Sequence, residues 1–139
     1  MTYTKNDAYM QTAKTFARLS KAKRLKVGSV LVDDGRVISC GYNGCVSGGS
    51  NECEFEVGGE LITKPEVIHA EANVILFAAK RGIPTDGCDL YTTHSPCYEC
   101  SKMIAQSGIR SVYYEEDYRD DTGIRFLRNN GINVSKEGY

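Results

Sequence analysis

The sequence contains no tryptophan, only three prolines among its 139 residues, and no long apolar run. A membrane-spanning helix needs an apolar stretch of about 18 residues, so we expect no membrane segment. The amino terminus shows neither an apolar run nor a small-residue cleavage site, and we therefore expect no secretory signal peptide. These absences favour a cytoplasmic protein.

A net excess of charge is absent as well. Seventeen Lys and Arg against 18 Asp and Glu leave a formal net charge of −1 at pH 7. Proteins bind nucleic-acid backbones through clustered Lys and Arg, so we expect no nucleic-acid partner, although the run KAKRLK at 21–26 is locally basic. A chain of this length fits one domain, 1–139, which can bury a core without a disulfide framework.

Cysteine is present at six positions, but their spacing is irregular. Cys97 and Cys100 form a CxxC pair, which in a cytoplasmic chain indicates metal or redox chemistry rather than a disulfide scaffold. Cys40 and Cys88 fall in expected strands, where a thiol is most simply a small core residue. We therefore expect reduced thiols.

The hydrophobic pattern predicts a hairpin followed by alternating helices and strands. A first helix is expected over 6–20 with Asn6 or Asp7 as its N-cap, and a long irregular loop over 43–59. The remaining elements are expected as strands at 27–32, 36–42, 88–93, 109–114 and 132–134, a turn at 33–35, and helices at 70–80, 97–107 and 121–130. This order favours an α/β sandwich with a mixed sheet.

Two short motifs at the starts of expected helices carry the chemistry. One is His69-Ala70-Glu71, and the other is PCYEC, which contains Cys97 and Cys100. One imidazole and two thiolates form a zinc ligand set that leaves the fourth tetrahedral position open for water, whose pKa the metal lowers to about 7. The combination HxE…PCxxC is the zinc-deaminase signature, in which the glutamate acts as general acid and base.

Other interpretations of the same residues stay open. His94 is the only other histidine, so His69, His94, Cys97 and Cys100 could form a closed structural zinc site, although such modules rarely occur inside a domain with its own core. A redox CxxC would leave the HAE motif unexplained. Glu71 could also be a plain charge favoured at a helix N-terminus.

Nearly the whole chain resembles deoxycytidylate (dCMP) deaminases of the cytidine/deoxycytidylate deaminase family, especially compact bacterial and phage forms. The resemblance lies in VGSVLV (27–32), GYNG (41–44), IHAEANVILFAAK (68–80), YTTHSPCYECSKMIAQSGI (91–109) and VYYEEDYRD (112–120). It implies a three-layer α/β/α sandwich with a five-stranded mixed sheet. It also implies one catalytic Zn2+ per chain and hydrolysis of dCMP to dUMP and ammonia, which supplies dUMP for dTTP synthesis.

The resemblance further assigns roles to single residues. Glu71 takes the proton of the attacking water, protonates N3 of the base and passes a proton to the leaving amine. The backbone of Ala70 and Ser95 reads the base edge, the N–H of Cys97 supports developing charge, and Asn43 contacts the nucleotide. A phosphate clamp is expected among four residues, Arg24, Lys26, Tyr118 and Arg119, although Lys and Arg at 21–26 are also what a solvated helix C-terminus favours.

Relatives of this kind are often hexamers that dCTP activates and dTTP inhibits, so the resemblance implies a homo-oligomer with these effectors. The implied effector site comprises Gly48, Ser50, Asn51 and Glu52, with Mg2+ accompanying the triphosphate. The same loop could instead only close over the active site. Cys45 and Cys53 alone cannot complete a second zinc site, although His94 could lend a third ligand.

Besides base-type or pterin-type deaminases, three rival functions remain. A tRNA adenosine deaminase shares the zinc signature but would require a basic surface. A free cytidine deaminase fits GYNG and the 72–80 helix less well than the nucleotide branch does. A non-catalytic zinc-binding or nucleotide-binding protein would not need Glu71 beside an open metal position.

Overall fold

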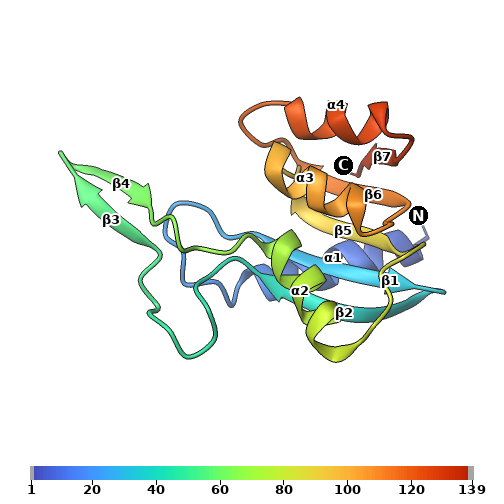
Figure 1. Cartoon of the computed structure of the whole chain (residues 1–139), viewed down its shortest axis with the longest axis horizontal. Coiled ribbons are helices and arrows are strands. Elements are labelled where there is room, and N and C mark those ends of the chain that lie inside the picture. The colour runs from blue at the N-terminus through green and yellow to red at the C-terminus, as the bar shows by residue number, and fades with distance from the viewer. Residues whose placement is uncertain (1, 138–139) are drawn as a thin grey trace.

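The chain forms an α/β body from which a second, two-stranded hairpin projects (Figure 1). The computed structural model describes residues 2–137. The elements are α1 (Lys5–Ala17), β1 (Gly28–Asp33), β2 (Arg36–Tyr42), β3 (Glu54–Val57), β4 (Glu60–Thr63), α2 (Ala70–Arg81), β5 (Asp89–His94), α3 (Tyr98–Gln106), β6 (Ser111–Glu116), α4 (Thr122–Asn129) and β7 (Asn133–Lys136). Within this described range, no helix is long and apolar enough to cross a membrane.

The main sheet has five strands in the order β2-β1-β5-β6-β7. Strand β1 pairs antiparallel with β2 and with β5, whereas β5, β6 and β7 are mutually parallel. The predicted five-stranded mixed sheet is therefore confirmed. Its central strand β5 ends at His94, and the chain then turns directly into the PCYEC motif.

Helices cover both faces of the sheet, which confirms the predicted three layers (Figure 1). On one face, Met10 and Ala13 of α1 pack against Val30, Val32 and Tyr91. On the other face, α2, α3 and α4 bury a larger apolar cluster: Leu31, Val74, Ile75, Ala78, Cys88, Leu90, Ile104, Ile109, Val112 and Leu127. Cys88 is thus a core residue, and partly buried Cys40 packs against the α1 face, as predicted.

Three tyrosines connect α1 to the sheet. The ring of Tyr91 on β5 lies 5.0 Å from that of Tyr9 and is stacked 4.5 Å from that of Tyr113 on β6. The Tyr91 hydroxyl donates to Asn6 Oδ1 near the start of α1. These contacts fix α1 against the middle of the sheet.

The predicted start of α1 was wrong. Thr4 is the N-cap: its hydroxyl accepts from the Asp7 N–H at 3.1 Å, and the Asp7 carboxylate accepts from the Thr4 N–H at 2.8 Å. This reciprocal capping box satisfies two backbone donors, which neither Asn6 nor Asp7 as N-cap would do. The helix also ends earlier than predicted, at Ala17.

The predicted irregular loop at 43–59 was wrong from residue 54 onward. Strands β3 and β4 form a hairpin there around Gly58 and Gly59, whose φ angles are +57° and +83°. Two consecutive positive φ angles match a type I′ turn, the twist that joins two antiparallel strands tightly. The hairpin at Asp34-Gly35, which was predicted, uses the same device, with φ of +49° and +75°.

Candidate active site

The starts of α2 and α3 bring together the three predicted metal ligands. His69 is the N-cap of α2, Cys97 is the N-cap of α3, and Cys100 lies in the first turn of α3. The His69 Nδ1 atom lies 3.5 Å from Cys97 Sγ and 3.4 Å from Cys100 Sγ. Helix N-termini present unpaired N–H groups and a positive dipole end, which favour thiolate over thiol.

The charges of these three side chains depend on one another. The pKa of Cys97 falls to about 4, chiefly because the Cys100 thiol donates a hydrogen bond to it, with help from His69. The pKa of Cys100 is raised because its proton is held in that same hydrogen bond. The pKa of His69 is raised by its hydrogen bond to Cys97. A metal ion would replace the shared proton and leave both sulfurs as thiolates.

The donor set fits zinc. One imidazole nitrogen and two sulfurs lie within 4.8 Å of one another, close enough to bind one ion, and two thiolates with one imidazole are typical catalytic zinc ligands. Among residues 2–137, His94 is not part of this group; its Nδ1 lies 2.8 Å from the Thr93 hydroxyl. The arrangement therefore favours an open three-ligand site over the closed four-ligand alternative.

Glu71 lies in the first turn of α2, where its side chain is 4% exposed. Burial raises the pKa of its carboxyl group, because removal from water disfavours the charged form. Thr92 on the central strand β5 donates a hydrogen bond to Glu71 Oε1 at 3.0 Å. The carboxylate is thus held in one orientation beside the ligand cluster.

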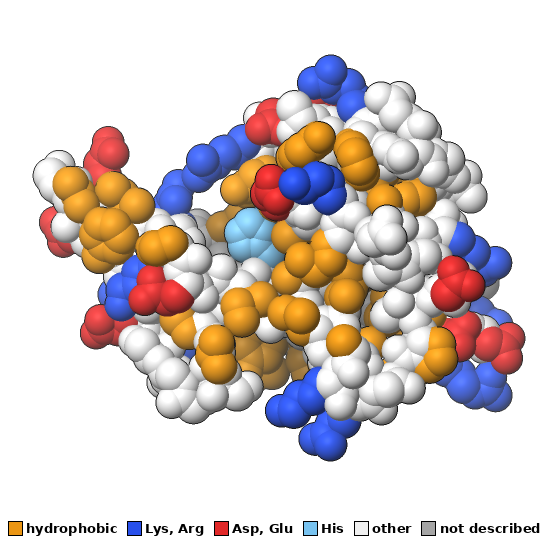
Figure 2. All heavy atoms as spheres, in the orientation of Figure 1, with side chains coloured by type: hydrophobic (Ala, Val, Ile, Leu, Met, Phe, Trp, Pro, Cys, Tyr) orange, Lys and Arg blue, Asp and Glu red, His pale blue; other side chains and the backbone are white. Residues whose placement is uncertain are grey.

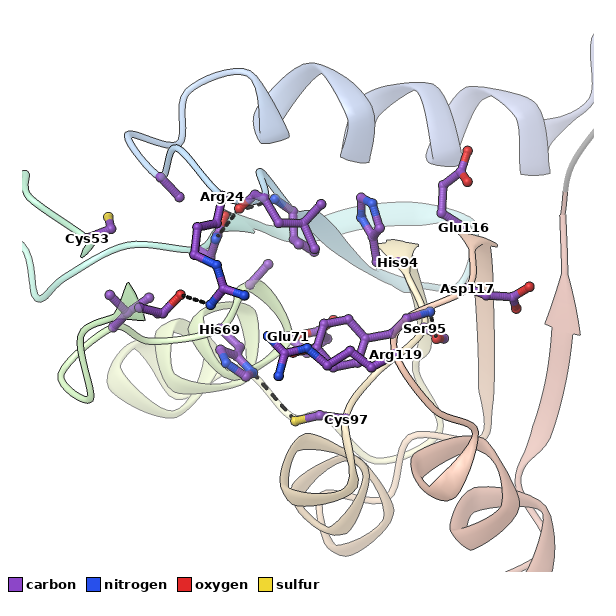
Figure 3. Close-up of a pocket in the computed structure, with 18 of the residues that line it drawn as sticks. Arg24, Cys53, His69, Glu71, His94, Ser95, Cys97, Glu116, Asp117 and Arg119 are labelled. Carbon is purple, nitrogen blue, oxygen red and sulfur yellow. Dashed lines mark hydrogen bonds between the residues drawn. The ribbon is translucent and has the colours of Figure 1, made fainter. Parts of the chain in front are cut away.

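A cavity of about 420 Å³ opens above this cluster, within the size range of small-molecule sites. In Figure 3, Arg24 and Arg119 extend into it from opposite sides, and His69 and Cys97 lie at its floor. Figure 2 shows a histidine side chain in the hollow between the projecting hairpin and the body. The lining residues are Ala22, Arg24, Leu25, Val27, Asn43, Cys53, Glu54, Thr63, Val67, His69, Ala70, Glu71, His94, Ser95, Cys97, Glu116, Asp117, Tyr118 and Arg119.

Most of the expected substrate-binding residues line this cavity. They are Arg24, Asn43, Ala70, Ser95, Tyr118 and Arg119. Lys26 is exposed and is not among the lining residues. The expected effector residues Gly48, Ser50, Asn51 and Glu52 also lie outside the lining.

Two polar side chains position the cavity wall. The Asn43 amide accepts from the Val27 N–H at 2.9 Å and donates to the Leu25 carbonyl at 2.8 Å. Ser95 accepts from the Tyr118 N–H at 2.7 Å, and its own N–H donates to the Glu116 carbonyl. Asn43 therefore orders the segment that carries Arg24, and Ser95 orders the loop that carries Arg119.

Sequence reasoning missed Glu54, Thr63, Glu116 and Asp117 as lining residues. Glu54 and Thr63 reach the cavity only through the β3–β4 hairpin. The one available signal was Gly58-Gly59 between two short stretches of strand-forming residues.

The comparison with known families decides the classification. The family described as the cytidine and deoxycytidylate deaminase zinc-binding region matches residues 3–116, most of the chain. The chain belongs to this deaminase family.

Individual members of this deaminase family match over nearly the full chain. The deoxycytidylate deaminase of Enterobacteria phage T4 is 35% identical, over 94% of this chain and 88% of its own length. The dCMP deaminase of cyanophage S-TIM5, whose structure contains dCMP and dUMP, is 44% identical with a TM-score of 0.90, covering 100% of this chain and 99% of that one. ComE operon protein 2 of Bacillus subtilis is 45% identical over 82% of this chain, which spans 60% of that relative.

Proposed function

We propose that this chain catalyses the zinc-dependent hydrolysis of dCMP to dUMP and ammonia. The observation that carries the proposal is the buried carboxylate of Glu71 beside His69, Cys97 and Cys100 at the floor of a nucleotide-sized cavity. The likeness to the cyanophage enzyme bound to dCMP and dUMP supports the same substrate. The dUMP formed would be used for dTTP synthesis.

Glu71 has the properties of the proton carrier. One Zn2+ per chain, held by His69, Cys97 and Cys100, would supply a Lewis acid that lowers the pKa of water to about 7. Glu71 takes one proton from the attacking water and delivers it to N3 of the base. It then takes the proton of the hydroxyl formed at C4 and delivers it to the amine, so that the C4–N bond breaks and ammonia leaves as the C4 carbonyl forms. Burial raises the pKa of the Glu71 carboxyl group, which makes the carboxylate a better proton acceptor, and Thr92 holds one of its oxygens by a hydrogen bond.

The backbone at the cavity floor matches the edge of cytosine. Ala70 is the first residue of α2, so its N–H has no acceptor within the helix and can donate to O2 of the base. The Ser95 N–H already donates to Glu116, so the Ser95 backbone can offer its carbonyl oxygen, which would accept from the cytosine amino group. The Cys97 N–H would support the oxygen on which charge develops.

The phosphate and sugar would lie toward the mouth of the cavity. Arg24 and Arg119 each offer a planar fork of N–H donors for phosphate oxygens, with Tyr118 beside Arg119 at 5.7 Å from guanidinium carbon to ring centroid. Asn43 has one amide hydrogen beyond its bond to Leu25, and this hydrogen is available to a sugar hydroxyl.

We further propose regulation by dCTP as activator and dTTP as inhibitor, with Mg2+ accompanying the triphosphate. The loop with Gly48, Ser50, Asn51 and Glu52 lies outside the cavity lining, so an effector there would not compete directly with substrate. Sigmoidal dCMP saturation that dCTP makes hyperbolic is the expected result, and curves that neither nucleotide alters would exclude this regulation.

The substrate is tested by incubating the zinc-loaded protein with dCMP, CMP, deoxycytidine and dCTP in parallel and measuring ammonia. Selective turnover of dCMP is expected. Preferred turnover of deoxycytidine would keep the Glu71 chemistry and remove the phosphate clamp. No turnover of any of the four, with one zinc bound per chain by elemental analysis, would exclude the proposed reaction.

A further inference from the structure

The projecting hairpin touches the body at the rim of the active-site cavity through Glu54, the first residue of β3. One oxygen of its carboxylate, Oε2, accepts hydrogen bonds from two consecutive backbone N–H groups, those of Lys23 at 2.8 Å and Arg24 at 2.9 Å. Hydrogen bonds to an ionised acceptor are stronger than those between neutral groups. The backbone from which the Arg24 side chain departs is therefore anchored to the hairpin.

A second contact holds the other end of the Arg24 side chain. Its Nη1 donates to the hydroxyl of Thr63 at 3.1 Å, and Thr63 lies opposite Glu54 in the β3–β4 register. A guanidinium has five N–H donors, and this bond uses one of them. In Figure 3 the Arg24 side chain spans the mouth of the cavity between the hairpin and His69.

The opposite end of the same segment is held by Asn43, through its bonds to Leu25 and Val27. The short stretch that carries Arg24 is therefore held on both sides before any substrate arrives. Such preorganisation reduces the ordering free energy that binding must otherwise supply.

A carboxylate at the mouth of a cavity for an anionic substrate would by itself weaken binding. The two backbone N–H donors of Lys23 and Arg24 offset part of the Glu54 charge. A role in holding Arg24 explains why an acidic side chain occurs at this position.

We propose that Glu54 is a positioning residue that, together with Thr63, sets the preference of the active site for a 5′-monophosphate by holding Arg24 toward the phosphate. This inference rests on the proposed function, because it assigns a specificity device to that same site. Glu54 acts through Arg24 and does not touch the reacting atoms.

The test compares Glu54→Ala, Glu54→Gln and the matched control Glu56→Ala in turnover of dCMP and of deoxycytidine, which has no phosphate. Glu56 is exposed and lies on the same face of the hairpin, two residue pairs nearer its tip. For Glu54→Ala we expect KM for dCMP to rise about tenfold with kcat within about twofold, in line with the loss of charge-assisted bonds. Glu54→Gln should recover part of the loss because its amide oxygen can accept the same N–H groups, and Glu56→Ala should match the wild type.

The deoxycytidine measurement separates positioning from folding. Equal losses with dCMP and deoxycytidine in Glu54→Ala would overturn the proposal in favour of a purely structural anchor, and so would an unchanged KM for dCMP. Calorimetric titration with dUMP gives a readout that needs no turnover. If the wild-type protein binds dUMP without deaminating dCMP, the proposed function fails, and a tenfold weaker dUMP affinity in Glu54→Ala would still support the positioning role, whereas equal affinity would overturn it.

Discussion

Glu71 occupies surroundings that normally exclude a carboxylate. It is almost completely buried, and the hydrogen bond from Thr92 offsets only part of the free energy of desolvation. An unfavourable buried charge that stability does not require is typical of a functional residue. The surrounding core of the α/β body holds it in place.

We predict that Glu71→Gln abolishes deamination while keeping zinc and fold. Loss of a general acid and base lowers the rate by about 100-fold to 10,000-fold, whereas an amide of the same shape removes a buried charge and should leave the melting temperature unchanged or higher. The measurements are ammonia release, zinc content and thermal unfolding. Glu99→Gln, at an exposed glutamate in the first turn of α3, is the control; turnover by Glu71→Gln near the wild-type rate would remove Glu71 from the mechanism.

For individual residues, the approach of His69 to Cys97 and Cys100 could be predicted from the sequence. The motif with His69 and the motif with Cys97 and Cys100 each begin a helix, and these two helices follow one another around the central strand. The contacts of Glu54 and Thr63 could not. They depend on how a hairpin docks onto a segment some 30 residues away, and no local pattern records that docking.

Among the elements, those with strong apolar runs were predicted to within two residues, including α2 and the five strands of the main sheet. Burial decides most of these elements and is visible in the sequence as apolar periodicity, whereas β7 is largely exposed and was predicted from the short apolar segment INV at 132–134. Strands β3 and β4 are short and largely exposed, with charged and apolar residues mixed, so only their turn carried a signal. The α1 cap was missed because Thr4 and Asp7 form a pair that must be considered together.

Helix α4 approaches the metal-binding turn through a glycine. A Cβ atom on Gly123 would lie 2.2 Å from the Pro96 carbonyl oxygen and 2.8 Å from that of Cys97, both backbone atoms. Such distances require the start of α3 to move. Because Gly123 has no side chain, α4 can lie this close to the turn, and the position of α4 therefore helps to set the position of Cys97.

We predict that Gly123→Ala weakens zinc binding and destabilises the protein by about 1–3 kcal/mol, the usual range for overpacking a close contact. Competition with a zinc chelator and chemical denaturation measure the two effects. The control is Gly44→Ala, where an added Cβ meets nothing within 4 Å. Equal zinc affinity in the two variants would show that the turn tolerates displacement of α4.

For the whole molecule, the distribution of exposed apolar side chains suggests association. Leu76 and Phe77 on α2 are 49% and 44% exposed, and the hairpin exposes Phe55, Val57, Leu61 and Ile62. An isolated two-stranded hairpin has little stability in water, and contiguous exposed apolar surface is typical of interaction sites. From these surfaces we predict that the chain forms a homo-oligomer.

We predict that Phe77→Glu reduces the size of the assembly, because a buried unpaired charge at an interface is strongly unfavourable. Sedimentation velocity measures the change. Leu19→Glu is the control, since Leu19 is 52% exposed and follows α1 on the other side of the sheet. A wild-type protein that sediments as a single chain would contradict both the homo-oligomer and the predicted hexamer.

The tyrosine stack of Tyr9, Tyr91 and Tyr113 has a spectroscopic consequence. Because the chain has no tryptophan, its near-ultraviolet dichroism is free of indole bands and comes chiefly from tyrosine. These three of the nine tyrosines lie on the α1 face, opposite the helices that hold His69 and Cys97, so their share of the signal reports tertiary order away from the candidate metal site. If removal of the metal by a chelator also removed this signal, the two faces of the sheet would unfold as one cooperative unit. If the signal persisted, the face with His69 and Cys97 would unfold locally while the α1 face stayed ordered.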